Sequence, residues 1–178
     1  MSVQLDLVQT TDPAGASLSA VDLSPAQVLQ SVFRILQTNV LCSMATVTPA
    51  GQAHINTAYF SYSDDLELVF LSHPASLHCR NISANSSMAM AVFSSAQKWG
   101  GPDQGLQFFG ACHPAAESLP AQEVYVNRFP GYRIWYQELG AEDPGREYRF
   151  YRFLPSQVKV FDETGLGGGL FVQANIMR

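Results

Sequence analysis

Three β-forming segments follow one another in this sequence with connections too short to hold anything but a tight turn. They are residues 40–48, 53–63 and 66–72. Pro49-Ala50-Gly51 separates the first two and Asp64-Asp65 the last two, and both are typical turn sequences. Strands joined by such short turns pair antiparallel with their neighbours. We therefore expect an antiparallel meander, and the rest of the fold has to be built around it.

Helices and further strands are predicted on both sides of the meander. Ser24, Pro25 and Gln27 form a capping box with proline at the first helical position, so a helix begins there. Apolar residues then recur at helical spacing as far as Asn39, which we expect to end the helix in a left-handed conformation. Shorter helices are predicted at residues 76–85, 120–129 and 132–139, and strands at residues 88–93, 106–113, 147–154 and 158–161.

Many short antiparallel strands with few helices are typical of a closed or partly closed barrel. Residues 88–93 are almost wholly apolar, and we expect this strand to be buried on both faces. The chain has 178 residues, of which 47% are hydrophobic, and this suits one domain. We assign that domain to residues 24–178. Residues 1–23 are predicted to be a flexible N-terminal arm, with a short strand within residues 3–8 as a further option.

Charge and composition restrict the partners. The net charge of −5 disfavours binding to nucleic acid or to an anionic membrane surface. Only 14% of residues are charged, which suggests that part of the surface is buried against another subunit. No apolar run reaches the ~18 residues of a membrane span. An odd number of cysteines (three) and the lack of a signal peptide indicate reduced thiols and a cytoplasmic protein.

The usual signatures of catalysis are not found. His54, His73, His78 and His113 come without a nucleophile motif, and neither they nor the cysteines have metal-binding spacing, so no metal site is expected. The sequence GLGGG at residues 165–169 is not followed by the Lys-Ser/Thr of a phosphate-binding loop. We interpret it as a flexible loop, followed by a short apolar segment at residues 170–172.

The most informative segment is SHPASLHCRN at residues 72–81. A strand ends at Ser72, and a helix begins at Ser76. Helix N-termini offer free N–H groups to anions, and Ser76 and His78 would add donors to the same site. In the alternative interpretation, Ser76 is only a helix cap, and His78 and Arg80 are exposed. The residues alone leave both interpretations open.

The order of these segments is similar to that of a known family. The helix at 24–39, the hairpin at 42–61, LVFLS, SHPASLHCRNISAN and SMAMAVF resemble the FMN-binding split-barrel superfamily of pyridoxamine 5′-phosphate oxidase. GLQFFG, YVNRFP and VFDETGLG look like a small, largely uncharacterised bacterial branch of it. The resemblance covers residues 23–172. It implies a mainly β fold, a six- or seven-stranded antiparallel split barrel with flanking helices, in a homodimer with two flavin sites at the subunit interface.

The resemblance also implies which residues hold the cofactor. In the family, the flavin lies along the second barrel strand and touches the end of the next one, and a Ser-Arg-Lys triplet grips its phosphate. The matching positions here are Asn56, Thr57, Ala58 and Tyr59, then Leu71 and Ser72, then Ser76, Leu77 and His78. Gln107 is the candidate for a glutamine that contacts the ring. Trp99 is expected either to cover the ring or to lie in the dimer interface.

The phosphate site departs from the family pattern. Leu77 and His78 stand where the family has arginine and lysine, and Asn56 stands where a basic residue is often found. Uncharged donors bind phosphate more weakly than an arginine fork does. Arg80, or an arginine of the C-terminal cluster of a second subunit, is a candidate to compensate. The pyridoxal phosphate-binding residues of the oxidase are not recognisable, so vitamin B6 oxidation is not expected.

The expected function is that of an FMN-dependent oxidoreductase acting on an unidentified small molecule. No catalytic acid or base can be named, although Tyr59, His54 and Trp99 are candidates for mutation. Three alternatives stay open. They are a non-catalytic flavin-binding or storage protein, a protein of the same fold that uses deazaflavin or haem, and a dimer with a degenerate, empty site.

The last third of the chain is rich in aromatic residues and arginines. Tyr132, Trp135 and Tyr136 are interpreted as packing or interface residues rather than substrate contacts. The near-alternate arginines, Arg146, Arg149 and Arg152, indicate either a solvated strand face or a patch that faces an anion.

Overall fold

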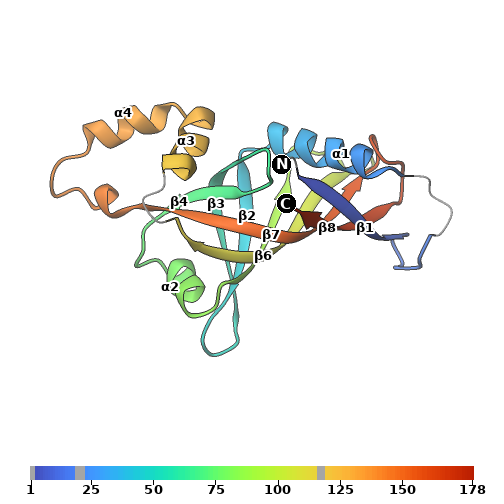
Figure 1. Cartoon of the computed structure of the whole chain (residues 1–178), viewed down its shortest axis with the longest axis horizontal. Helices are drawn as coiled ribbons and strands as arrows, with labels where there is room; N and C mark the ends of the chain where they lie inside the picture. Colours follow the sequence, from blue (N-terminus) through green and yellow to red (C-terminus); the bar gives the residue numbers. More distant parts are fainter. Residues whose placement is uncertain (1–2, 19–22, 116–118) are drawn as a thin grey trace.

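A computed structural model describes residues 3–18, 23–115 and 119–178. Within these residues eight strands form one antiparallel sheet, and four α-helices and a 3-10 helix lie around it (Figure 1). The strands are β1 (Gln4–Thr11), β2 (Leu41–Val47), β3 (Ala53–Tyr62), β4 (Leu68–Ser72), β5 (Ser87–Phe93), β6 (Gln104–Pro114), β7 (Arg149–Asp162) and β8 (Phe171–Met177). The helices are α1 (Pro25–Thr38), α2 (Leu77–Ala84), α3 (Leu119–Arg128), α4 (Gly131–Glu138) and η1 (Pro144–Glu147).

Six of the strands close into a barrel, in the order β7-β4-β3-β2-β5-β6 and back to β7. The predicted meander is its β2-β3-β4 portion. One end of β7 pairs with β4, and the other end pairs with β8. The neighbour of β7 therefore changes partway along the strand, and β8 and β1 extend the sheet beyond the barrel. This architecture confirms the predicted antiparallel split barrel.

Part of the predicted N-terminal arm is a strand of the sheet. β1 pairs antiparallel with β8, and Val3 and Leu5 are buried against the barrel core. Burial of these two side chains stabilises the strand. β1 extends to Thr11 and is therefore longer than the short strand that the sequence suggested within residues 3–8. Residues 1–2 and 19–22 of the predicted arm lie outside the described residues.

The two strands predicted at 147–154 and 158–161 are one continuous strand. Pro155 lies within β7, opposite Gly110 of β6, where the pairing register shifts between Phe109 and Gly110. Proline has no N–H to donate, and a bulge is a position where a sheet tolerates it. A Cβ atom on Gly110 would lie 2.3 Å from the carbonyl oxygen of Leu154. Gly110 therefore permits the close approach of β6 and β7 that closes the barrel.

Three further expectations are corrected. Asn39 is extended (φ −121°, ψ 134°) instead of left-handed, and its side chain donates to the carbonyl of Ile35 at 2.8 Å. β5 is buried on one face only, because Met88, Met90 and Val92 alternate with more exposed residues. The segment after the glycine-rich loop is a full strand, β8, and not a short apolar stretch.

The helices pack at different parts of the barrel. α1 begins with the predicted capping box, in which the Ser24 hydroxyl accepts from the Gln27 N–H, and its apolar face is buried in the main core. Figure 1 shows α3 and α4 together at the opposite end, beside β3 and β4. There Tyr125 of α3 packs in a second, smaller cluster with Val69 of β4. None of the helices in the described parts of the chain has the length and apolar character that a membrane crossing needs.

Candidate functional site

The main cavity lies against an open edge of β3. β3 has ten residues, but only Phe60, Ser61 and Tyr62 pair with β4. Within the described chain, the first seven residues therefore have no strand partner on the side away from β2. A cavity of about 870 Å³ lies along this edge, a volume within the range of small-molecule sites. Unpaired backbone N–H and C=O groups of such an edge are available to a ligand.

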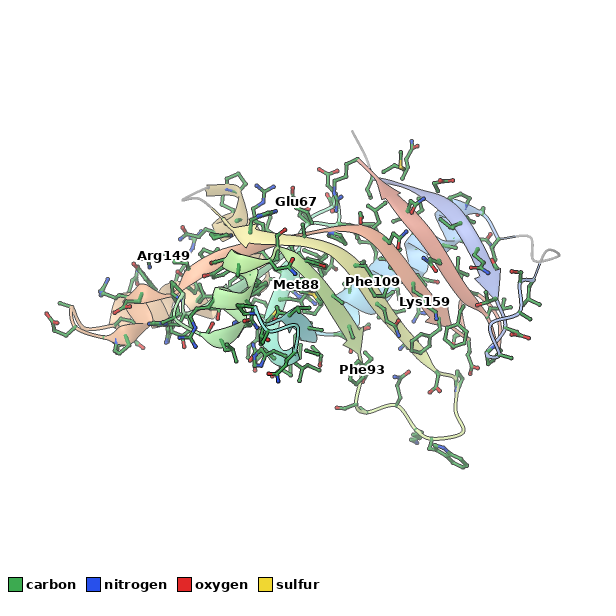
Figure 2. All side chains as sticks on the ribbon, turned by 90° about the horizontal axis from the view of Figure 1, so that it is seen from below. Glu67, Met88, Phe93, Phe109, Arg149 and Lys159 are labelled. Atoms are coloured by element: carbon green, nitrogen blue, oxygen red, sulfur yellow. The ribbon has the colours of Figure 1, made fainter. Side chains whose placement is uncertain are left out.

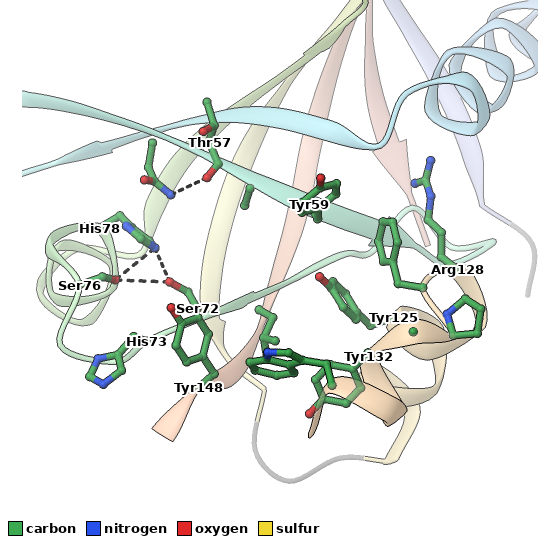
Figure 3. A pocket seen from close by; sticks show the side chains of 17 residues that line it. Thr57, Tyr59, Ser72, His73, Ser76, His78, Tyr125, Arg128, Tyr132 and Tyr148 are labelled. Carbon is green, nitrogen blue, oxygen red and sulfur yellow. Dashed lines mark hydrogen bonds between the residues drawn. The ribbon is translucent and has the colours of Figure 1, made fainter. Parts of the chain in front are cut away.

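The polar end of the cavity is built where β4 runs into α2. The Ser72 hydroxyl lies 2.6 Å from Nε2 of His78, and the Ser76 hydroxyl lies 3.2 Å from the same nitrogen (Figure 3). The two hydroxyl oxygens are 3.4 Å apart. Ser76 is the N-cap of α2, but its side chain makes no capping hydrogen bond. Its hydroxyl is directed to the cavity cluster instead, which leaves the N–H groups of the first turn of α2 without a side-chain acceptor.

His78 is largely buried, and burial lowers its pKa. A histidine with a lowered pKa is neutral at pH 7, with one ring nitrogen as donor and the other as acceptor. The cluster of Ser72, Ser76 and His78 is therefore a set of uncharged hydrogen-bonding groups.

The other end of the cavity is made by α3, α4 and the residue after η1. It consists mainly of aromatic side chains, namely Tyr125, Phe129, Tyr132, Trp135 and Tyr148. Arg128 fixes this end to the barrel. Its Nη2 donates to the carbonyls of Leu36 and Asn39 at 2.6 Å, and its Nη1 donates to the carbonyl of Phe60 at 3.2 Å. The guanidinium also lies 4.7 Å from the centre of the Phe60 ring. Arg128 thus holds α3 against the end of α1 and against β3.

Most of the predicted cofactor residues lie on this cavity. They are Asn56, Thr57, Ala58, Tyr59, Leu71, Ser72, Ser76 and His78. Asn56 of this group donates its side-chain N–H to the carbonyl of Thr57 at 3.0 Å. Leu77 follows the cap of α2 and is exposed, outside the cavity lining.

Gln107 and Trp99 also lie elsewhere. Gln107 faces outward from β6, in a register row that runs through Ala91 and Ser43 to Thr57. Three strand spacings separate Gln107 from Thr57, which is roughly 14 Å. The loop after Phe93, which joins β5 to β6, extends away from the barrel (Figure 2), and Trp99 in this loop is fully exposed. Within one chain neither residue reaches the cavity.

The residues that the sequence analysis missed come mainly from the α3–α4 region. Tyr132 and Trp135 were interpreted as packing residues, yet both line the cavity as well as packing on each other. The density of aromatic residues from Tyr125 to Tyr136 is the signal that marks this segment. No periodicity could show that it folds back onto β3, some 70 positions earlier in the chain.

The arginine-rich segment does not form a patch on one strand. Arg146 lies in η1 and donates to the carbonyls of Leu139 and Gly140. Arg149 donates to the carbonyls of Arg146 and Tyr148, and Arg152 is paired with Glu67. None of the three belongs to the lining of the cavity. The described residues also contain no group of three or more histidine, cysteine or acidic side chains arranged to hold a metal.

Known proteins match this chain in sequence pattern and in fold. Residues 29–160 match the family model described as Pyridoxamine 5′-phosphate oxidase, about three quarters of the chain. No curated protein sequence matches the chain at a significant level.

Several solved structures share the fold. A heme binding protein from Mycobacterium smegmatis has a TM-score of 0.65 at 14% identity, over 84% of this chain and 58% of that chain. HutZ, the heme storage protein from Vibrio cholerae, has a TM-score of 0.57 at 18% identity, over 81% and 93%. An FAD-binding protein from Mesorhizobium loti has a TM-score of 0.57 at 19% identity, over 85% and 95%.

The match to the family model begins within α1 and ends near the end of β7. It therefore includes all six barrel strands, the open edge of β3 and the polar end of the cavity at α2. On this match, the chain belongs to the pyridoxamine 5′-phosphate oxidase family.

Proposed function

We propose that the cavity binds FMN and that the protein is a flavin-dependent oxidoreductase acting on a small molecule. One observation carries the proposal. The open edge of β3 and the uncapped N-terminus of α2 face the same cavity, in a chain of this family. A planar ring with polar edges suits the first feature, and a phosphate suits the second.

The donors at the polar end fit a phosphate without an added cation. The hydroxyls of Ser72 and Ser76, the ring of His78 and the free N–H groups of α2 can all donate to phosphate oxygens. Arg80 lies on α2 but is exposed and outside the lining, so within one chain it does not supply the missing charge. We therefore expect FMN to bind more weakly here than in relatives with an arginine and a lysine at this site.

The β3 edge fits the flavin ring. Its unpaired backbone groups can hydrogen-bond the polar edge of the ring, and Ala58 and Leu71 offer apolar contacts. When bound, the flavin supplies the redox chemistry. The chain would bind and orient it, and β3 and β4 would keep water from one face of the ring.

The first experiment is the visible absorption spectrum of the purified protein, with mass spectrometry of whatever acid releases. A yellow protein that releases FMN supports the proposal. Release of a deazaflavin, or a haem spectrum, would replace FMN by another cofactor. The haem outcome is relevant because two of the similar structures are of a heme binding and a heme storage protein. A colourless protein that does not take up added FMN would favour a degenerate site.

The double variant Ser76→Ala, His78→Ala is expected to bind FMN about tenfold more weakly or worse, because it removes two donors to the phosphate. The measurement is a flavin fluorescence titration. Ser83→Ala and His113→Ala are the matched controls, because both residues are exposed and outside the cavity. The placement of the phosphate is wrong if the double variant binds FMN as the unchanged protein does.

The predicted homodimer also has a candidate surface. Ile55, Ala45, Ala89 and Phe109 form a register row across the outer faces of β3, β2, β5 and β6. Ile55 is 69% exposed, and none of the charged side chains in the described parts of the chain lines the shallow hollow on this face. Exposed apolar patches of this kind mark interaction sites. We propose that a second copy of the chain covers this face.

Ile55→Asp is expected to weaken the dimer at least about tenfold, because it places a charge at the centre of an apolar interface. Analytical ultracentrifugation over a range of concentrations measures this. Ile134→Asp, which changes an isoleucine of similar exposure on α4, is expected to leave the dimer intact. A monomeric unchanged protein, or a dimer unaffected by Ile55→Asp, would contradict the proposed interface.

A further inference from the structure

The aromatic end of the cavity forms a continuous band of rings, which we call the aromatic wall. It consists of Tyr59, Phe129, Tyr125, Tyr132, Trp135 and Tyr148. Successive ring centres are 5.7, 4.9, 5.9, 5.7 and 6.1 Å apart. These distances are within the range of favourable aromatic contacts, so each ring holds the next in position. The wall is therefore a fixed surface.

Much of this surface is not used for packing. Tyr59, Trp135 and Tyr148 are each more than a third exposed although they line a cavity. A wall that served only the core would bury these rings, because their apolar area is large. The exposed rings leave room for one more flat group to stack.

The wall carries no free charge. Among the described residues, the cavity lining contains no aspartate, glutamate or lysine, and Arg128 is its only arginine. His73 also lines the cavity, and its Nε2 lies 3.2 Å from the carboxylate of Glu147. The guanidinium of Arg128 is committed to three backbone carbonyls and lies against Phe60 and Tyr62. A phosphate or carboxylate at this end would lose its water without gaining a cation, which is costly. An uncharged ring meets no such cost.

One polar group at the wall is still available. Figure 3 shows the hydroxyl of Tyr125 pointing from α3 toward the middle of the cavity. Within the described chain this hydroxyl makes no hydrogen bond. Burial, with smaller effects of Tyr132, Tyr59 and Cys42, raises the pKa of Tyr125 to about 12, so the hydroxyl keeps its proton. It can donate to a carbonyl or hydroxyl substituent of a ligand.

We infer that the aromatic wall binds the substrate, and that this substrate is an uncharged planar ring compound with a polar substituent, not a phosphorylated one. The inference rests on the proposed function, because it places the substrate between the wall and a flavin along the β3 edge. The polar end at Ser72, Ser76 and His78 is then left to the cofactor phosphate. The two ends of one cavity thus divide recognition between an anion and a neutral ring.

The test compares two probes with the same naphthalene ring, 2-naphthol and 2-naphthyl phosphate, by calorimetric titration of the FMN-saturated protein. We expect 2-naphthol to bind at least about tenfold more tightly, because only the phosphate must be desolvated without a cation. Trp135→Ala is expected to weaken 2-naphthol binding by about tenfold, the usual size of a lost stacking contact. Ile134→Ala shortens an exposed side chain next to Trp135 on α4, outside the cavity lining, and is expected to leave binding unchanged.

The outcomes separate this inference from the proposed function. Equal or tighter binding of 2-naphthyl phosphate would overturn the inference, as would a Trp135→Ala variant that binds 2-naphthol normally. Tyr148→Ala is the second variant should Trp135→Ala fail to fold by circular dichroism, and a loss of similar size is expected. If FMN does not bind, the proposed function fails. The wall is then tested on the cofactor-free protein by the effect of Trp135→Ala on 2-naphthol binding, because the empty polar end could accept the phosphate of the second probe.

Discussion

Gly110→Ala is expected to lower the free energy of unfolding by about 3 kcal/mol, at the upper end of what overpacking costs. The added Cβ would lie 2.3 Å from the carbonyl oxygen of Leu154 and 2.5 Å from Cα of Pro155. Both atoms belong to the backbone, so they cannot turn away as a side chain would. β6 and β7 would have to separate where they close the barrel. Urea unfolding followed by circular dichroism measures the loss.

The control is Gly140→Ala, a change in a surface loop where a Cβ meets no atom within 4 Å. Its effect is expected to stay within about 0.5 kcal/mol. An unchanged unfolding midpoint for Gly110→Ala would mean that the bulge relaxes freely, and that Pro155 does not constrain the seam between β6 and β7.

Arg128→Met is expected to lower the free energy of unfolding by about 2–3 kcal/mol, because it leaves three backbone carbonyls without their donor. Two of these carbonyls belong to the fully buried residues Leu36 and Phe60. The cost stays below the sum for three isolated groups, since Arg128 is only partly buried and water can reach part of the site. Thermal and urea unfolding both report it.

Two variants distinguish the contribution of the Arg128 hydrogen bonds to stability from the contribution of its positive charge. Arg133→Met removes an exposed arginine from α4 and is expected to change stability by less than about 0.5 kcal/mol. Arg128→Lys keeps a cation but cannot reach three carbonyls with a planar fork, so a loss close to that of Arg128→Met is expected. Full stability of Arg128→Lys would show that charge alone holds α3 in place.

The barrel was predictable because its signals are local. The turns at Pro49-Ala50-Gly51 and Asp64-Asp65, and the capping box at Ser24, act within a few residues and agree with the final structure. The errors arose where a distant partner decides the outcome. β8 has a weak pattern of its own and is stabilised by β7 and β1. Asn39 is extended, although a left-handed residue was expected to end the helix there. The Asn39 side chain and Arg128 donate hydrogen bonds to the carbonyls at the end of α1.

The candidate site divides in the same way. The family resemblance implied the positions on β3, at the end of β4 and at the start of α2, and all of them except Leu77 line the cavity. Gln107 does not line the cavity, because its register row places it three strands away from Thr57. Residue spacing along β6 could not show which register row Gln107 joins. Its exclusion followed only from the pairing of four strands.

The sequence by itself determined the strands of the meander, the helix at Ser24 and the helix start at Ser76, because each is set by short-range hydrogen bonding and hydrophobic periodicity. Only the tertiary structure decided that β4 stops short of pairing the first part of β3, and that α3 and α4 fold back beside the open edge. Arg128 holds α3 in this position by donating hydrogen bonds to backbone carbonyls some 70 to 90 residues earlier in the chain. Contacts of such separation depend on three-dimensional packing, so no local pattern could place an aromatic wall opposite the polar end of the same cavity.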